Sequence, residues 1–200
     1  MLERLAAGAT ALAQGVASVA GVRSGTEEPP FEVLDRARGI EIRRYGARLA
    51  AETEVPADET ASRSEGFSRL ARYIFGGNQA KARIAMTAPV AQAKARSGHR
   101  IRFFLPASLQ EPPAPADPRV RIVQVPAETC AVLRFSGSTA PQCVADAKAR
   151  LLAALRDTAW VAEGSPSAWF YDPPWTIPAL RRIEVAVPVR KISPAPTPPA

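Results

Sequence analysis

The chain is 200 residues long and 46% hydrophobic, which allows one sizeable core but not two full domains. Its formal net charge is +7 and its pI is about 10.1, and Arg supplies nearly all of the positive charge. No recognition helix, RNA-binding strand motif or zinc finger accompanies this charge. We therefore expect an Arg-rich solvated surface and no nucleic-acid partner.

The first 24 residues are predicted to be an appended, weakly amphipathic helix or a targeting segment. Residues Leu5–Val22 carry no charge, but Ala, Gly, Ser and Thr dominate them, so the stretch is too weakly apolar for a transmembrane helix. As a signal peptide it lacks a basic start and a dense Leu run. The default expectation is a cytoplasmic protein; the alternative is export or membrane association through this segment.

Two Pro-rich stretches divide the rest of the chain. Glu111–Pro118 is predicted to be a surface connection in the middle of the fold, and residues 193–200 a disordered tail. Residues 25–192 then form one domain with halves at about 31–106 and 119–190. We expect this domain to be a monomer.

The first half follows the order strand, strand, helix, loop, strand. Alternating and helical periodicities predict strands at Phe31–Leu34, Gly39–Arg43, Leu49–Val55 and Ile101–Leu105, and a helix over Glu65–Phe75. Gly76 supplies the left-handed conformation that ends many helices.

The second half repeats this order. Strands are predicted at Val120–Val125, Cys130–Phe135 and Ile183–Val189, and a helix over Gln142–Arg156 that buries Val144, Leu151, Leu152 and Leu155. Alone, each half would leave a sheet face and a helix stripe exposed. The predicted fold is therefore α+β: a duplicated, pseudo-twofold, twisted antiparallel β-barrel flanked by two α-helices.

Four stretches resemble the SOUL/heme-binding protein family in order and spacing. They are Gly25–Phe31, Leu70–Asn78, Met86–Val90 and Tyr171–Trp175, the last followed by the pair Arg181 and Arg182. The resemblance covers about residues 25–190. It implies a twisted β-barrel built by duplication, with two helices, that binds heme or a related tetrapyrrole non-covalently in a shallow apolar groove, without known catalysis.

The resemblance also implies a binding site along the first helix and beside the Tyr-Asp-Pro-Pro loop. Carried over by motif, the site residues are Arg63, Phe67, Leu70 and Ile74 on the helix and Trp175, Thr176 and Arg181 on the loop. Apolar walls with cations at the rim suit a porphyrin and its propionates. An apolar stripe on a helix is also typical of a core, and Trp175 could instead plug the end of the barrel.

No residue stands out as an axial iron ligand. His99 is the only histidine, and it is predicted to lie in a hairpin turn far along the chain from the helix stripe. We expect core packing for Met86, and local hydrogen bonds for Tyr73 and Tyr171. Binding would then depend on hydrophobic and propionate contacts.

Other functions stay open. The same groove could bind another apolar or cationic small molecule as an effector, with Glu184 or Asp172 as the counter-charge, or serve an unrecognised enzyme. For Glu184, opposite Ile183 on its strand, an outward position beside an Arg is the simpler expectation. Cys130 and Cys143 have no metal-ligand spacing and are expected to be buried or half-buried thiols.

Overall fold

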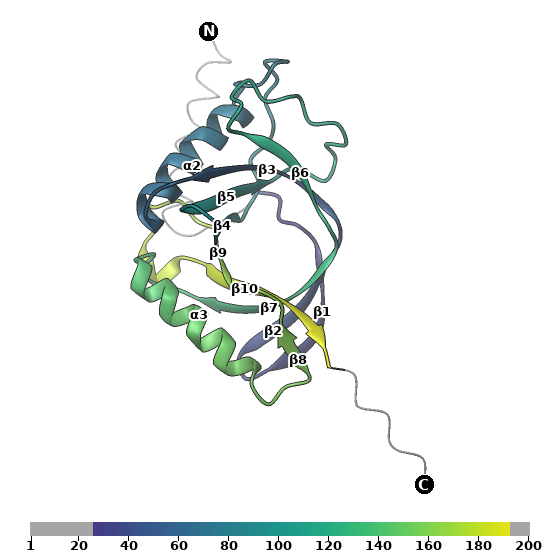
Figure 1. Cartoon of the computed structure of the whole chain (residues 1–200), viewed down its shortest axis with the longest axis vertical. Coiled ribbons are helices and arrows are strands. Elements are labelled where there is room, and N and C mark those ends of the chain that lie inside the picture. Colours follow the sequence, from purple (N-terminus) through teal and green to yellow (C-terminus); the bar gives the residue numbers. More distant parts are fainter. Residues whose placement is uncertain (1–25, 193–200) are drawn as a thin grey trace, which may run out of the picture.

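The structure is a computed structural model that describes residues 26–192; the expectations for residues 1–24 and 193–200 lie outside the described residues. Two helices flank one side of a large antiparallel sheet (Figure 1). In chain order the elements are β1 (Phe31–Ala37), β2 (Ile40–Tyr45), β3 (Arg48–Val55), α2 (Glu59–Ile74), β4 (Val90–Lys94), β5 (His99–Phe104), β6 (Arg121–Val125), β7 (Glu128–Phe135), α3 (Pro141–Leu155), β8 (Trp160–Ala162), β9 (Ser167–Phe170), η1 (Pro178–Leu180) and β10 (Ile183–Lys191).

The strand order confirms the predicted duplication. The sheet runs β1-β2-β7-β10-β9-β4-β5-β3-β6, with β8 beside β10. The series β2, β3, α2, β4, β5 of the first half matches β6, β7, α3, β9, β10 of the second, and the pseudo-twofold passes between β4 and β9. The halves exchange their first strands, because β2 pairs with β7 and β6 pairs with β3.

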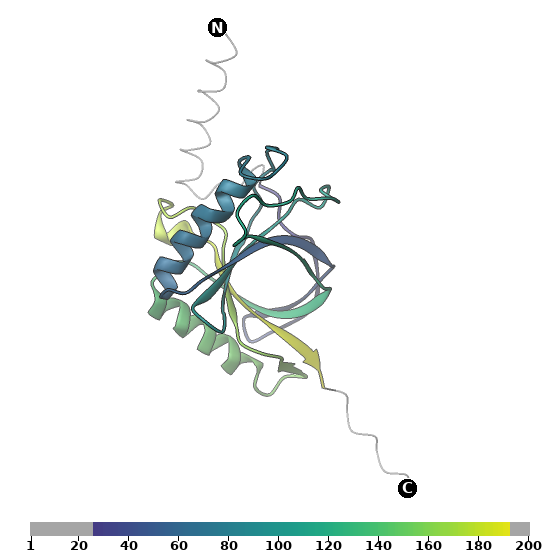
Figure 2. The same cartoon turned by 45° about the horizontal axis from the view of Figure 1, so that its top comes forward.

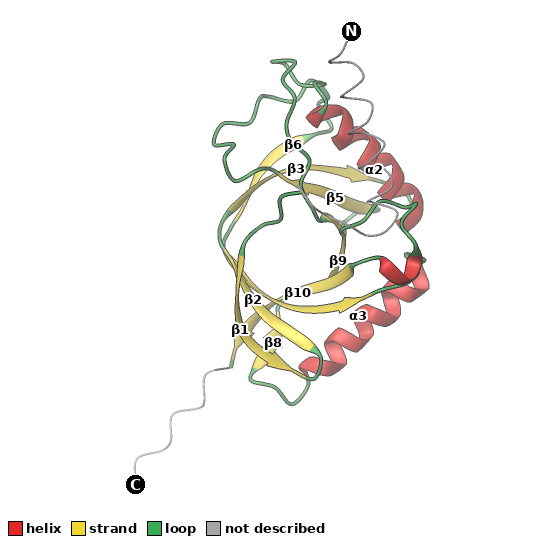
Figure 3. Cartoon of the chain, turned by 180° about the vertical axis from the view of Figure 1, so that it is seen from behind, coloured by secondary structure: helices red, strands yellow, loops and turns green. Residues whose placement is uncertain are grey.

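The sheet is curled rather than closed into a barrel by a continuous ladder, which corrects the predicted barrel. Its end strands, β1 and β6, do not pair with each other in the described part of the chain. The sheet nevertheless bends back on itself (Figures 1 and 3). The β2–β7 ladder ends at the pair Tyr45 and Glu128, and the β3–β6 ladder begins at the pair Arg48 and Val125. The two ladders are therefore separated only by residues 46–47 on one side and 126–127 on the other. Pro126 has no N–H with which to continue a ladder.

Helix α2 begins six residues earlier than its hydrophobic stripe predicts. Asp58 caps it, accepting hydrogen bonds from the backbone N–H groups of Thr60 and Ala61 at 2.9 Å each. Gly66 lets the helix approach β5, because a Cβ at this position would lie 2.4 Å from Cγ1 of Ile101. The helix ends as predicted, with Gly76 at φ +102° and the N–H of Gly77 bonded to the carbonyl of Arg72.

Helix α3 packs on the second half of the sheet. Val144, Leu151 and Leu155 are buried as predicted, but Leu152 is exposed, because the apolar stripe is narrower than the run of Leu residues. Among the thiols, Cys130 is buried in β7 and Cys143 is exposed at the start of α3, so the prediction of a shielded thiol is wrong for Cys143.

The two faces of the curled sheet differ in chemistry. The outer face packs against α2 and α3 through two apolar clusters, one for each half. The inner face, turned away from both helices (Figure 2), combines a smaller aromatic and aliphatic cluster with many Arg–Glu pairs. In residues 26–192 we find no helix with the length and apolar character needed to cross a membrane.

Candidate functional site

A row of apolar residues crosses the outer face of the sheet beneath both helices. The row follows strand register, each residue paired with the next across β5, β4, β9, β10 and β7, and consists of Phe103, Val90, Phe170, Ile183 and Phe135. The middle of the row lies where the two halves meet. It forms an apolar floor between α2 and α3.

Two predicted residues of α2 cover this floor. The guanidinium of Arg63 lies 4.5 Å from the centre of the Phe170 ring, and its Nη2 donates to the carbonyl of Thr139 at 3.3 Å. Phe67, one turn later, packs edge-on to Phe103 with ring centres 5.3 Å apart, yet 38% of it stays exposed. The two side chains thus present a cation and an aromatic surface together.

Arg63 also holds an unused donor. Its Nη1 is buried and has no hydrogen-bond partner among the described residues. Burial lowers the pKa of Arg63, while the nearby Glu59 carboxylate acts in the opposite direction. A buried cationic donor without an acceptor is costly, so this position favours an anionic or carbonyl ligand.

The loop between β9 and β10 brings the other predicted residues. It exposes three large apolar side chains within six positions, and Trp175 is 64% exposed; the other two are Ile177 and Leu180. Arg181 fixes the loop, because its Nε donates to the carbonyl of Thr176 at 2.8 Å and its Nη2 to that of Pro174 at 2.6 Å. The short helix η1 lies between α2 and α3 (Figures 1 and 3).

Four of the seven predicted residues are accessible, Arg63 and Phe67 on α2 and Trp175 and Arg181 on the loop, and we call these four residues the α2–loop surface. The other three lie behind it. Leu70 and Ile74 are 0% and 1% exposed and belong to the core of the first half, and Thr176 is buried in the loop. They support the surface from within, and direct contact with a ligand is not available to them in this structure.

A cavity of 490 Å³ lies beside this loop, and of its lining residues only Arg181 was predicted from the sequence to belong to a binding site. Its lining consists of Arg134, Phe135, Ser136, Ala179, Leu180 and Arg181. Arg134 is exposed and forms no ion pair among the described residues. The backbone N–H of Gly137 bonds to the carbonyl of Pro178 at 2.8 Å, which joins the end of β7 to η1. In the sequence, this cavity is marked only by Arg134, and a single Arg at the end of a strand does not indicate a binding site.

The candidate iron ligands occupy different places. His99 begins β5 instead of lying in the turn, and its Nδ1 is 3.1 Å from the carbonyl of Ala57, just before α2. The hydroxyls of Tyr73 and Tyr171 donate to Pro113 and Glu184, in agreement with the prediction of local hydrogen bonds. Met86 is 40% exposed, so the expectation of core packing is wrong there.

Glu184, the carboxylate considered as a counter-charge for a cationic ligand, already forms ion pairs within the protein. Glu184 is fully buried on the inner face, 2.8 Å from Nη1 of Arg43 and 3.0 Å from Nε of Arg182, and it accepts the Tyr171 hydroxyl at 2.8 Å. The predicted Arg partner is present, but the predicted outward position is wrong because the curled sheet encloses this face. Asp172 accepts the N–H of Arg182 at 2.6 Å.

The described residues contain no group of three or more His, Cys, Asp or Glu side chains arranged to hold a metal ion.

Comparisons with solved structures show the fold. The EcmrR C-terminal domain matches with a TM-score of 0.57 and 13% identity over 76% of this chain and 98% of that chain. EcmrR in a complex with DNA matches with the same score and identity, but this chain spans only 57% of it. A hydrolase from Listeria innocua matches with a TM-score of 0.52 and 10% identity, over 78% of this chain and 94% of that one.

Sequence comparisons give the family. A search of curated proteins finds no significant match. The family model described as SOUL heme-binding protein matches residues 26–188, which include both halves, the α2–loop surface and the inner face. The chain belongs to the SOUL heme-binding protein family.

Proposed function

We propose that this protein binds heme or a related tetrapyrrole, non-covalently and without catalysis, on the α2–loop surface. The observation that carries the proposal is the pairing of exposed Phe67 with the buried, unpartnered Nη1 of Arg63 on one face of α2. Such binding would serve buffering, transport or sensing.

The chemistry of the surface suits this class of ligand. A tetrapyrrole has two wide apolar faces and carboxylates at one edge. Phe67 and Trp175 offer flat apolar area, and Arg63 and Arg181 offer cations for the carboxylates. Arg134 and the 490 Å³ cavity extend the surface beyond Arg181. The family's name adds weight to heme in particular.

Iron ligation is not required for this proposal. His99 is already bonded to the Ala57 carbonyl, and the two tyrosine hydroxyls have acceptors. We therefore expect most of the affinity to come from apolar contacts and carboxylate pairing, so that His99→Ala leaves binding nearly unchanged.

Titration of the purified protein with hemin, followed by the Soret band, tests the proposal. We expect saturation at one equivalent with a Kd of about 1 μM or tighter. The control is an unrelated protein of similar pI, because a basic surface attracts propionates unspecifically. A titration that does not saturate and matches this control contradicts the proposal. Loss of the Soret band in His99→Ala would contradict binding without His ligation.

A further inference from the structure

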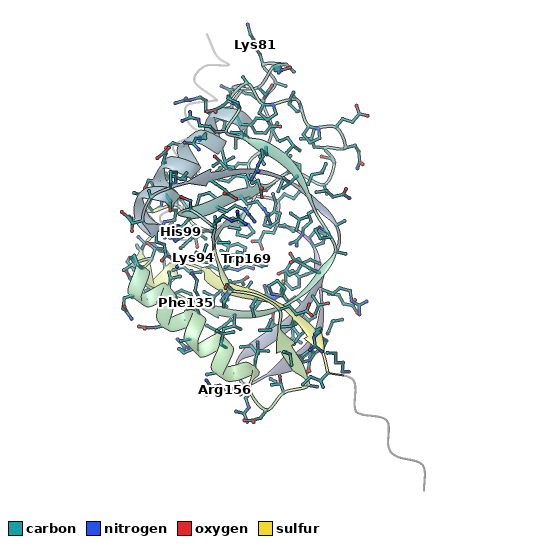
Figure 4. All side chains as sticks on the ribbon, viewed as in Figure 1. Lys81, Lys94, His99, Phe135, Arg156 and Trp169 are labelled. Carbon is teal, nitrogen blue, oxygen red and sulfur yellow. The ribbon has the colours of Figure 1, made fainter. Side chains whose placement is uncertain are left out.

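A second cavity lies on the inner face of the sheet, opposite the α2–loop surface. It measures 160 Å³, and its walls come from β4, β5, β7, β9 and β10. Successive residues of β9 face opposite ways: Phe170 belongs to the outer floor, while Trp169 lines the inner cavity. Figure 4 shows Trp169 within the curl of the sheet and Phe135 on the α3 side.

The wall of this cavity is touched by a buried Arg with unused donors. The side chain of Arg48 is only 7% exposed, and its guanidinium lies between the rings of Tyr45 and Phe104, at 4.6 and 4.7 Å. Its Nη2 bonds to Glu128, but Nε and Nη1 have no partner among the described residues. Phe104 and Glu128 both line the cavity. Arg48 itself does not line the cavity, so its guanidinium adds positive potential beside a bound anion without a direct hydrogen bond to it.

The charges around the cavity leave an excess of one positive charge. Two separate ion-pair groups lie on this part of the inner face: Arg48 with Glu128, and Arg100, Arg102 and Arg121 with Glu52 and Glu54. Arg100 and Arg102 line the cavity directly. Glu128 also lines it, and two cations against one anion among the lining residues favour a monoanion as the ligand.

The size and remaining walls narrow the ligand further. The volume is close to that of an engineered protein cavity of about 150 Å³ that holds benzene. Trp169 and Phe104 supply aromatic walls, and Ala91, Ala93 and Ala186 add small apolar side chains to the lining. We propose that this cavity is a binding site for a small planar monoanion, an aromatic carboxylate, separate from the α2–loop surface.

Calorimetric titration with benzoate tests this site, with benzamide and benzamidinium as neutral and cationic probes of the same shape. We expect saturable binding of one benzoate with a Kd of about 1 mM or tighter. Neither control probe should bind comparably. Failure of benzoate to bind in this range, or equal binding of either control, overturns the proposal.

Two variants locate the site. Ala93→Leu places a larger side chain in the cavity without removing a charge, and Ala179→Leu makes the same change in the 490 Å³ cavity. Ala93→Leu should abolish benzoate binding and leave hemin binding unchanged, whereas Ala179→Leu should leave benzoate binding unchanged. Benzoate binding that survives Ala93→Leu overturns the assignment to this cavity.

A third variant separates an electrostatic role from structural damage. Glu128→Gln removes the carboxylate that competes for Arg48, so the excess positive charge rises by one. We expect benzoate to bind about threefold to tenfold more tightly, because a Coulomb interaction screened by water has this order of magnitude. General loosening of the fold would weaken binding instead, and that result would count against the proposal.

Discussion

Arg63 lies on Phe170 with 4.5 Å between its guanidinium carbon and the ring centre, and this contact joins the helix of one half to the sheet of the other. Its second contact, to the Thr139 carbonyl, reaches the loop that begins α3. A single side chain therefore meets both halves at the pseudo-twofold. It places a cation at the middle of the apolar row, where it could pair with an anionic group of a flat ligand.

Reversing this charge should weaken hemin binding. In Arg63→Glu we expect a loss of about tenfold or more, since hydrogen bonds between charged groups contribute about 1.5–3 kcal/mol. Arg150→Glu makes the same change of net charge at an exposed position of α3 and should bind hemin like the wild type. Soret titrations measure both. Equal losses in the two variants would mean that only the overall charge matters.

Substitutions at Phe67 and Leu70 should affect hemin binding and protein stability differently. Phe67→Ala removes exposed aromatic surface, so we expect weaker hemin binding with a modest loss of stability. Leu70→Ala opens a hole in the core of the first half and should lower the free energy of unfolding by about 2–5 kcal/mol. Urea unfolding and hemin titration of each variant provide the measurements. Unchanged hemin affinity in Phe67→Ala would remove this residue from the site.

The sequence predicts the helices and strands of this fold better than it predicts which of their residues are buried. Helical periodicity placed Phe67, Leu70 and Ile74 on one stripe, and Gly76 marked the end of the helix. The stripe alone could not show that Phe67 stays at the surface while Leu70 and Ile74 are buried. That difference depends on where β5 passes beneath the helix, which is a tertiary feature.

The burial and ion pairing on the inner face could not be predicted from the sequence. Alternation along β10 separates Glu184 from Ile183, but it does not say whether the second face is open to solvent. Arg43, which pairs with Glu184, is 141 positions away in the chain. The pairing follows from the exchange of first strands between the halves, which brings β2 beside β7 and close to β10. Local patterns carry no information about such an exchange.

Neutralising Glu184 should destabilise the protein strongly. Glu184→Gln leaves the guanidinium groups of Arg43 and Arg182 without their shared carboxylate, and removing one partner of a buried pair costs about 3–5 kcal/mol. Glu32→Gln is the matched control: its pair with Arg44 is exposed, so the change should stay within about 0.5 kcal/mol. Urea unfolding measures both. A small effect at Glu184 would show that the buried cluster contributes little to stability.

The stability should fall in alkaline solution because buried tyrosines resist ionisation. Burial raises the pKa of Tyr45 to about 12, with the guanidinium of Arg43 opposing this and the Glu184 carboxylate adding to it. Burial also raises the pKa of Tyr171, again with Glu184 acting in the same direction. A raised folded-state pKa gives stability that is complete below the unfolded-state pKa of about 10 and is lost as pH rises toward the folded-state value.

Tyr45→Phe removes one of these titrating groups. Between about pH 10 and 12 each such group lowers the free energy of unfolding by about 1.4 kcal/mol per pH unit, so the curve of the variant should be shallower by up to this amount. Urea unfolding across this range, with wild type and variant side by side, measures the difference in slope. The exposed pair Glu32–Arg44 offers a control, since Glu32→Gln should leave the alkaline slope unchanged. Parallel curves for Tyr45→Phe and the wild type would show that Tyr45 ionises as easily in the folded protein as in the unfolded chain.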